Sequence, residues 1–231
     1  MLNRLAIPVS EDVPLPMESH GIGYGYMVYR TELHRDYTDA KLSFESIGDR
    51  AQIYVNDTFA GTVYVNRPPY EVTFSAKSGD CLTVIVENMG RTNFGPKMMR
   101  KKGIVGRCLL DGKIHFGWQA WPLTMENLDA LSFDAAELMK QATPGGGETF
   151  YRFAFDCDHP ADTFLRTDGF RKGFAVLNGF NLGRYWEIGP QRTLYVPACV
   201  LHPGENELIL FESDGLRGAP VITFTDQPDL G

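Results

Sequence analysis

The stretch Lys172-Gly-Phe-Ala-Val-Leu-Asn-Gly-Phe-Asn-Leu-Gly-Arg-Tyr-Trp186 decides the fold of this chain. Two apolar segments flank Asn178-Gly179, the dipeptide that most strongly favours a two-residue hairpin turn, because both residues accept a positive φ. A Gly-Pro break follows at Gly189-Pro190, and residues 191–196 then predict another short strand. The region is therefore predicted to be antiparallel β structure.

The composition favours an all-β protein with an ordinary core. The chain has 231 residues, of which 43% are hydrophobic and 22% charged, and its 24 glycines and 14 prolines indicate many turns and few long helices. A formal net charge of −7 argues against nucleic acid as a partner, since phosphate binding needs a basic face. No apolar run is long enough to predict a membrane span. The first residues also lack the apolar stretch of a signal peptide, which favours a cytoplasmic location.

The cysteines and histidines predict no metal site, and no cofactor is expected. Cysteines occur at four separate positions without Cys-x-x-Cys spacing, and their apolar surroundings favour buried free thiols over disulfides: Cys81, Cys108, Cys157 and Cys199. Five histidines are scattered, and none has an i, i+4 partner or lies in a cysteine-rich cluster.

The chain repeats itself at a constant spacing of 122 residues. Asn56 corresponds to Asn178, Gly61 to Gly183, and the pair Tyr29-Arg30 to Tyr151-Arg152. Matches in the same order predict two copies of one module, each a jelly-roll β-sandwich of roughly eight strands. The predicted domains are residues 1–113 and 114–231. One short helix is predicted in the connection, over residues 131–141, with Ser132 as its N-cap.

The same motifs resemble a known family of enzymes. The segment Asn178-Gly-Phe-Asn-Leu-Gly-Arg-Tyr-Trp186 and residues 203–212 closely resemble the C-terminal region of glycoside hydrolase family 35, the β-galactosidases. This resemblance implies tandem galactose-binding-like sandwiches, whereas both catalytic carboxylates of that family lie on a (β/α)8 barrel. Such a barrel needs about 250 residues of alternating strand and helix, and the chain has neither that pattern nor spare length.

The function implied by the resemblance is accessory. No catalytic residue is predicted, and the chain alone is expected to be inactive. It would buttress the catalytic barrel of the same parent protein, which is the predicted partner, and could support a homodimer. A β-galactoside sugar is a second candidate partner. The alternative is a stand-alone carbohydrate-binding module of the galactose-binding type, and a pure interaction domain is a third hypothesis.

Residues 88–103 combine turn-forming residues with five basic side chains and no acid. One interpretation is a solvated basic loop. The resemblance gives another, because Gly90-Arg-Thr-Asn-Phe-Gly95 matches a loop that lies toward the barrel mouth in family members. It implies a substrate-entrance loop with Arg91, Asn93 and Phe94 as site residues. Gly90 and Gly95 permit a tight excursion, so Phe94 is predicted to be exposed and Arg91 free to bind a barrel carboxylate or a sugar.

The tryptophans are predicted to pack rather than to bind sugar. An aromatic residue on a sandwich strand is more often core than ligand platform. We therefore expect Trp121 and Trp186 in a core, and Trp118 at the junction between the domains. A binding module would instead need a groove with an aromatic floor and convergent polar groups.

Overall fold

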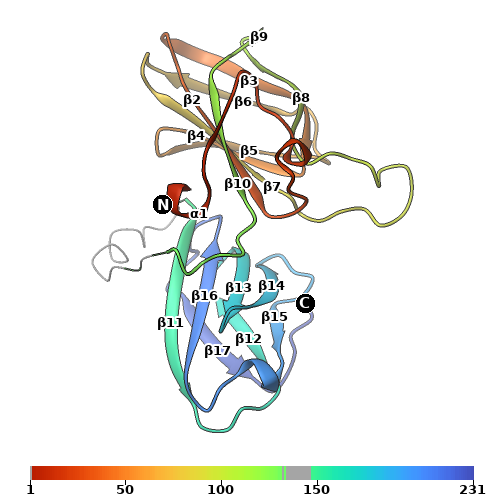
Figure 1. Ribbon diagram of the computed structural model, residues 1–231, viewed down its shortest axis with the longest axis vertical. Coiled ribbons are helices and arrows are strands. Elements are labelled where there is room, and N and C mark those ends of the chain that lie inside the picture. The colour runs from red at the N-terminus through yellow and green to blue at the C-terminus, as the bar shows by residue number, and fades with distance from the viewer. Residues whose placement is uncertain (1, 132, 134–146) are drawn as a thin grey trace. The chain divides into compact units, whose positions relative to one another are not determined.

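The computed structural model describes residues 2–131, 133 and 147–231, which divide into two compact units, Met1–Ser132 and Phe133–Gly231 (Figure 1). Both units consist of antiparallel sheets, so the all-β prediction is confirmed. Helical segments within the described residues are short: α1 (Leu2–Leu5), η1 (Met17–His20) and η2 (Ala198–Val200). No helix in this part of the chain is both long and apolar enough to cross a membrane. The helix predicted over 131–141, with its cap Ser132, lies largely outside the described residues.

The first unit is a sandwich of two sheets. Six strands form one sheet, in the order β1 (Val9–Glu11), β10 (Trp118–Leu123), β2 (Tyr26–Glu32), β7 (Cys81–Glu87), β4 (Arg50–Val55), β5 (Thr58–Tyr64). Four strands form the other, in the order β6 (Glu71–Ala76), β3 (Tyr37–Gly48), β8 (Gly103–Leu110), β9 (Lys113–Ile114). Inward side chains alternate along the strands, and one core joins Tyr29, Ile53 and Val84 of the first sheet to Leu42 and Ile104 of the second.

The second unit is a smaller sandwich. Its first sheet has the order β11 (Thr149–Cys157), β16 (Gly204–Glu212), β13 (Lys172–Leu177), β14 (Phe180–Trp186). Its second sheet has the order β15 (Thr193–Val196), β12 (Thr163–Asp168), β17 (Val221–Thr225). Buried residues from both sheets, including Leu177, Leu208 and Leu165, form a single core.

The two copies predicted from the 122-residue spacing are confirmed at their hairpins. In β4–β5 Ile53 pairs with Gly61, and in β13–β14 Ala175 pairs with Gly183; the register shifts immediately after each pair. Asn56 and Asn178 both have positive φ, 52° and 48°. Each asparagine side chain also accepts a backbone N–H from a neighbouring strand, from Cys81 in the first unit and from Glu207 in the second. The repeat is therefore structural as well as sequential.

The boundary between the units differs from the predicted one after residue 113. Strand β10 pairs with β2 from Trp118↔Thr31 to Leu123↔Tyr26, so the first unit continues through this strand. Trp118 is 1% exposed and belongs to the core of the first unit. The prediction that it packs at a domain junction is therefore wrong, because its ring fills the interior of one sandwich. Trp121 is buried, as predicted.

The thiols follow the prediction only in part. All four cysteines are free, but only Cys108 is buried, Cys81 and Cys157 are half-buried, and Cys199 is exposed. Burial raises the pKa of the Cys108 thiol to about 12, so this group stays a neutral core side chain.

Candidate functional site

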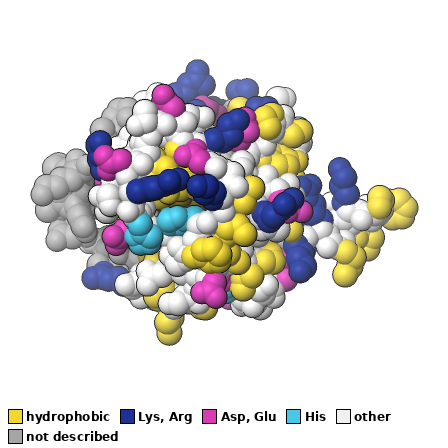
Figure 2. All heavy atoms as spheres, turned by 90° about the horizontal axis from the view of Figure 1, so that it is seen from above, with side chains coloured by type: hydrophobic (Ala, Val, Ile, Leu, Met, Phe, Trp, Pro, Cys, Tyr) yellow, Lys and Arg dark blue, Asp and Glu magenta, His cyan; other side chains and the backbone are white. Residues whose placement is uncertain are grey.

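The loop between β7 and β8 of the first unit is the candidate site. It projects from the body of the unit as a long excursion (Figure 1), and hydrophobic and basic side chains gather on it (Figure 2). Phe94 is 87% exposed and Met99 91% exposed, so two large apolar side chains stand in water. The backbone turns twice, where Met98 donates to Gly95 and Arg100 donates to Lys97. Gly90 and Gly95 both have positive φ, which accounts for the tight excursion that was predicted.

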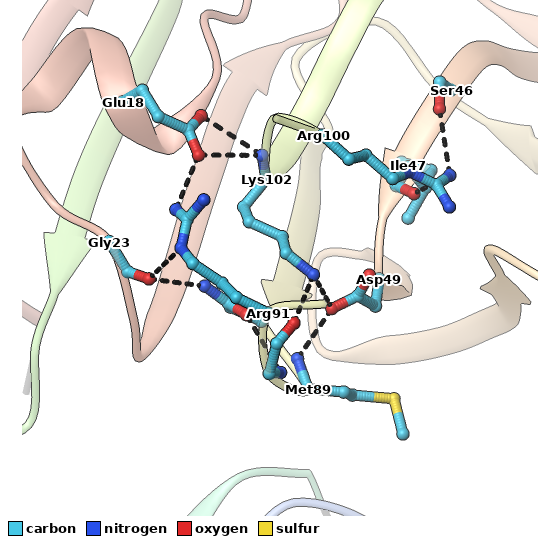
Figure 3. Close-up of polar contacts among 11 residues, drawn as sticks. Glu18, Gly23, Ser46, Ile47, Asp49, Met89, Arg91, Arg100 and Lys102 are labelled. Carbon is cyan, nitrogen blue, oxygen red and sulfur yellow. Dashed lines mark hydrogen bonds and ion pairs between the residues drawn. The ribbon is translucent and has the colours of Figure 1, made fainter. Parts of the chain in front are cut away.

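A buried ion pair holds the root of the loop. The Nζ atom of Lys102 lies 2.5 Å from Oδ2 of Asp49, and it also donates to the backbone oxygen of Gly90 (Figure 3). The same Asp49 oxygen accepts the backbone N–H of Met89 at 2.9 Å. One ammonium and one carboxylate therefore join the start of the loop to its end, and both are nearly inaccessible to solvent, with side-chain exposures of 6% for Lys102 and 12% for Asp49.

A second anchor is formed by Arg91 and Glu18. The Nη2 atom of Arg91 lies 2.6 Å from Oε1 of Glu18, and its Nε donates to the backbone oxygen of Gly23 at 2.8 Å (Figure 3). Glu18 also accepts the backbone N–H of Lys102. The prediction that Arg91 is free is therefore wrong for its Nε and Nη2 atoms, which bind Gly23 and Glu18 within the first unit.

These contacts lower the pKa of the Glu18 carboxyl. Partial burial by itself would raise the pKa of Glu18, but the hydrogen bonds from Arg91 and from backbone N–H groups outweigh it and hold the pKa below its ordinary value of 4.5. An acid with a lowered pKa in the folded state stabilises that state above its ordinary pKa, and the contribution is lost as the pH falls through the folded value.

We expect Glu18→Gln to loosen the loop at pH 7 by about 1 kcal/mol, a modest figure because the pair is partly solvated. Hydrogen exchange of the Lys102 backbone amide should accelerate about fivefold, because a free-energy change of about 1 kcal/mol corresponds to that ratio of rates. The wild-type protein should lose the same protection on acidification below pH 4.5, while the variant should change little. Glu45→Gln, which breaks the solvated Arg107–Glu45 pair, is the matched control and should leave the loop unaffected. Equal exchange in both variants would contradict the anchor.

Arg100 is also tied to the body, through Nη2 contacts with the hydroxyl of Ser46 and the backbone oxygen of Ile47 (Figure 3). The interpretation as a solvated basic loop is therefore wrong for Arg100 and Lys102, whereas Arg91 is exposed but paired with Glu18. Lys97 and Lys101 are also exposed, and no contact of their side chains with an acid is found among the described residues. Of the predicted site residues, Asn93 and Phe94 are exposed at the tip and Arg91 is at the root.

Sequence reasoning missed the two acids that position the loop. Glu18 lies in η1 and Asp49 lies between β3 and β4, far from residues 88–103 in the chain. No spacing pattern links them to the loop. A buried lysine requires a partner, but the burial of Lys102 is evident only from the structure. Met98 and Met99 were visible in the sequence as flexible apolar residues.

The second unit holds a hollow beside Trp186. Trp186 is half-buried, so the prediction that it belongs to a core is wrong. Its neighbour Tyr185 is buried instead, and the Tyr185 hydroxyl donates to the backbone oxygen of Phe211 at 2.8 Å. Strand alternation explains the difference, because successive side chains of β14 point to opposite faces.

Comparisons with known proteins point to one group of enzymes. The family model described as "Beta-galactosidase, first all-beta domain" matches residues 14–124, and "Beta-galactosidase, galactose-binding domain" matches residues 148–206. Beta-galactosidase 1 of Dictyostelium discoideum is 34% identical over 93% of the chain and 35% of its own length. Beta-galactosidase-1-like protein 2 of Homo sapiens is 31% identical over 100% of the chain and 36% of its own length. The chain thus spans little more than a third of these relatives.

Among solved structures, a lectin from Pleurotus ostreatus in complex with GalNAc matches with 14% identity and a TM-score of 0.28, covering 88% of this chain and 77% of that chain.

Proposed function

Since the chain belongs to the β-galactosidases, whose first all-β and galactose-binding domains it carries, we propose that it is the non-catalytic accessory region of a family 35 glycoside hydrolase. In this proposal a (β/α)8 barrel elsewhere in the same polypeptide hydrolyses terminal β-galactosyl bonds by double displacement, with two carboxylates as nucleophile and acid–base. The two sandwiches buttress that barrel, and the loop between β7 and β8 reaches its substrate entrance.

The exposure of Phe94 carries the proposal. An apolar ring in water is unfavourable, and burying it stabilises a complex by roughly 1.5–3 kcal/mol. The loop that presents this ring is held at its root by two ion pairs, Lys102–Asp49 and Arg91–Glu18. A ring carried on an anchored loop loses less conformational freedom on binding than a ring on a flexible one. An exposed ring on an anchored loop is more typical of a binding surface than of a surface residue without a binding role.

The tip has the composition of a docking surface. Phe94 lies close in sequence to Met98 and Met99, which are 50% and 91% exposed. Methionine side chains adapt their shape to irregular apolar partners. We assign Phe94 to the edge of the sugar pocket, Asn93 to a polar contact beside it, and the methionines to the barrel surface. Arg91 is a positioning residue, because it acts through Glu18 and Gly23.

The experiment measures the full-length enzyme that carries this region. Phe94→Ala should lower kcat/KM for a chromogenic β-galactoside by about 10–100-fold, the kinetic equivalent of losing about 1.4–2.7 kcal/mol of contact. The unfolding midpoint of the isolated chain should stay unchanged, because Phe94 touches no core. Phe94→Tyr should retain most of the activity.

The matched control is Phe180→Ala, which removes a ring that is 51% exposed on the hairpin of the second unit. It should leave kcat/KM unaltered. The isolated wild-type chain should show no turnover above background. Unchanged kinetics in Phe94→Ala, or unfolding of that variant, would refute the assignment of the loop. Turnover by the purified chain that one carboxylate substitution in it abolishes would refute the accessory role.

A further inference from the structure

The hollow beside Trp186 has the dimensions of a small-ligand site. Its volume is about 300 Å³, and polar groups line most of it: Arg166, Asp168, Glu187, Arg192 and Arg217. Trp186 is the half-buried aromatic residue of the lining, whereas the other aromatic lining residues, Phe170 and Tyr185, are buried in the core. A concave surface with one accessible ring and convergent polar groups is typical of ligand sites.

The internal repeat allows the surroundings of Trp186 to be compared with those of the equivalent residue in the first unit. Its counterpart in the first unit is Tyr64, 122 residues earlier, and two guanidinium groups lie over that ring, Arg50 at 5.7 Å and Arg67 at 5.3 Å from its centroid. In the second unit Lys172 takes the place of Arg50 and lies 4.8 Å from the Trp186 centroid. The position of Arg67 is occupied by Gly189. The second covering cation is thus replaced by a residue without a side chain. Trp186 is also one of the residues that line the hollow.

Among the residues that line the hollow, arginines outnumber acids. Glu187 pairs with Arg171 at 3.0 Å and with Arg217 at 3.3 Å. Arg166 pairs with Asp168 at 3.2 Å and with Asp229, which is not a lining residue, at 3.9 Å. Arg192 is the third lining arginine; its backbone N–H donates to Asp229, but no carboxylate of the described residues pairs with its guanidinium. Three arginines therefore face two acids in a protein whose formal net charge is −7.

We propose that this hollow binds a pyranose that carries a carboxylate, a hexuronate. The sugar ring would lie against Trp186, and its carboxylate would bind Arg192 and Arg217. Arginine presents several N–H donors in a planar fork, so Arg217 can serve Glu187 and a ligand together, and paired N–H donors match a carboxylate. A neutral hexose offers the same ring without the group that these arginines favour.

The larger hollow of the first unit lacks these features. It measures about 760 Å³ and is lined by residues of β1, β2 and β10 together with Gly79 and Cys81. Its one aromatic lining residue is Trp118, which is 1% exposed and offers no ring surface. The Trp186 hollow is therefore the better candidate for a sugar.

The test compares two ligands that differ only at C6, methyl D-galacturonide and methyl D-galactoside, by titrating the ¹⁵N-labelled chain. The galacturonide should bind about tenfold more tightly and shift amides of β14 and of residues around 192 and 217. Arg192→Ala should remove that preference, and Trp186→Ala should weaken both ligands at least about tenfold. Trp186→Phe, which keeps a ring, should retain the preference and serves if the alanine variant fails to fold.

Tyr64→Ala is the matched control, because it removes the equivalent ring from the first unit. It should leave both affinities unchanged. The proposal is overturned if neither ligand binds at millimolar concentration, if the two bind equally, or if Tyr64→Ala weakens binding as much as Trp186→Ala. Its failure would leave the accessory role of the loop untouched, since that role is measured by the kinetics of Phe94→Ala.

Discussion

Replacing Lys102 by alanine should lower the free energy of unfolding of the first unit by about 3–5 kcal/mol, the usual cost of breaking a buried ion pair from one side. The variant leaves the carboxylate of Asp49 buried without its ammonium partner, since the two groups lie 2.5 Å apart with side-chain exposures of 6% and 12%. It also deprives the backbone oxygen of Gly90 of a donor. Urea unfolding followed by tryptophan fluorescence measures the change, because Trp118 reports on this core.

Two comparisons separate the buried charge from a general loss of side-chain contacts. Lys41→Ala breaks a solvated pair with Glu71, whose side chains are 54% and 36% exposed, and should cost less than about 0.5 kcal/mol. In an Asp49→Asn background, Lys102→Ala should cost clearly less than in the wild type, because no uncompensated charge remains. A loss under about 1 kcal/mol, or full additivity of the two changes, would contradict the ion-pair account.

The same pair connects stability to the proposed function. Lys102 and Asp49 join residues 89–90 to the end of the loop, so they fix the base from which Phe94 projects. A variant that unfolds this root should disturb the substrate entrance and the sandwich together. Phe94→Ala removes only the exposed ring. The contrast between these variants distinguishes the scaffold of the loop from its contact surface.

Local chemistry explains what the sequence could predict. The hairpins at Asn56 and Asn178 follow from residues that accept positive φ, and the register shift recurs at the same place in both copies. Phe94 could be predicted as exposed because Gly90 and Gly95 bracket it and Pro96 prevents helix continuation. In each case the residues that determine the conformation lie within a few positions of the feature.

Contacts between distant segments explain what the sequence could not predict. Glu18 reaches a loop that begins about 70 residues later, and Asp49 pairs with a lysine 53 residues away. The hydrophobic periodicity of the sequence gives no information about such long-range pairings. The boundary after residue 113 was misplaced for the same reason, since β10 belongs to the first unit through its pairing with β2, a strand near the other end of that unit. Tertiary pairing, not local propensity, assigns that strand.

The tryptophans give the second large expected effect. Trp118→Ala should lower the free energy of unfolding of the first unit by about 3–5 kcal/mol, because it empties a core site of a fully buried indole. Trp118 is 1% exposed, and its Nε1 donates to the backbone oxygen of His115 at 2.8 Å. Denaturant unfolding of the isolated chain measures the loss, with the remaining tryptophans or circular dichroism as the signal.

Trp186→Ala is the internal comparison, and it should cost only about 1–2 kcal/mol, because the side chain is half-buried. The variant also removes the contact of the ring with the Lys172 ammonium. Strand alternation alone predicts that both tryptophans could lie in a core. The difference between the expected losses of unfolding free energy therefore rests on the tertiary structure. A cost for Trp186→Ala equal to that of Trp118→Ala would mean that the ring is core and not a ligand wall. A small cost with intact folding would leave the ring available for the sugar that its hollow is proposed to bind.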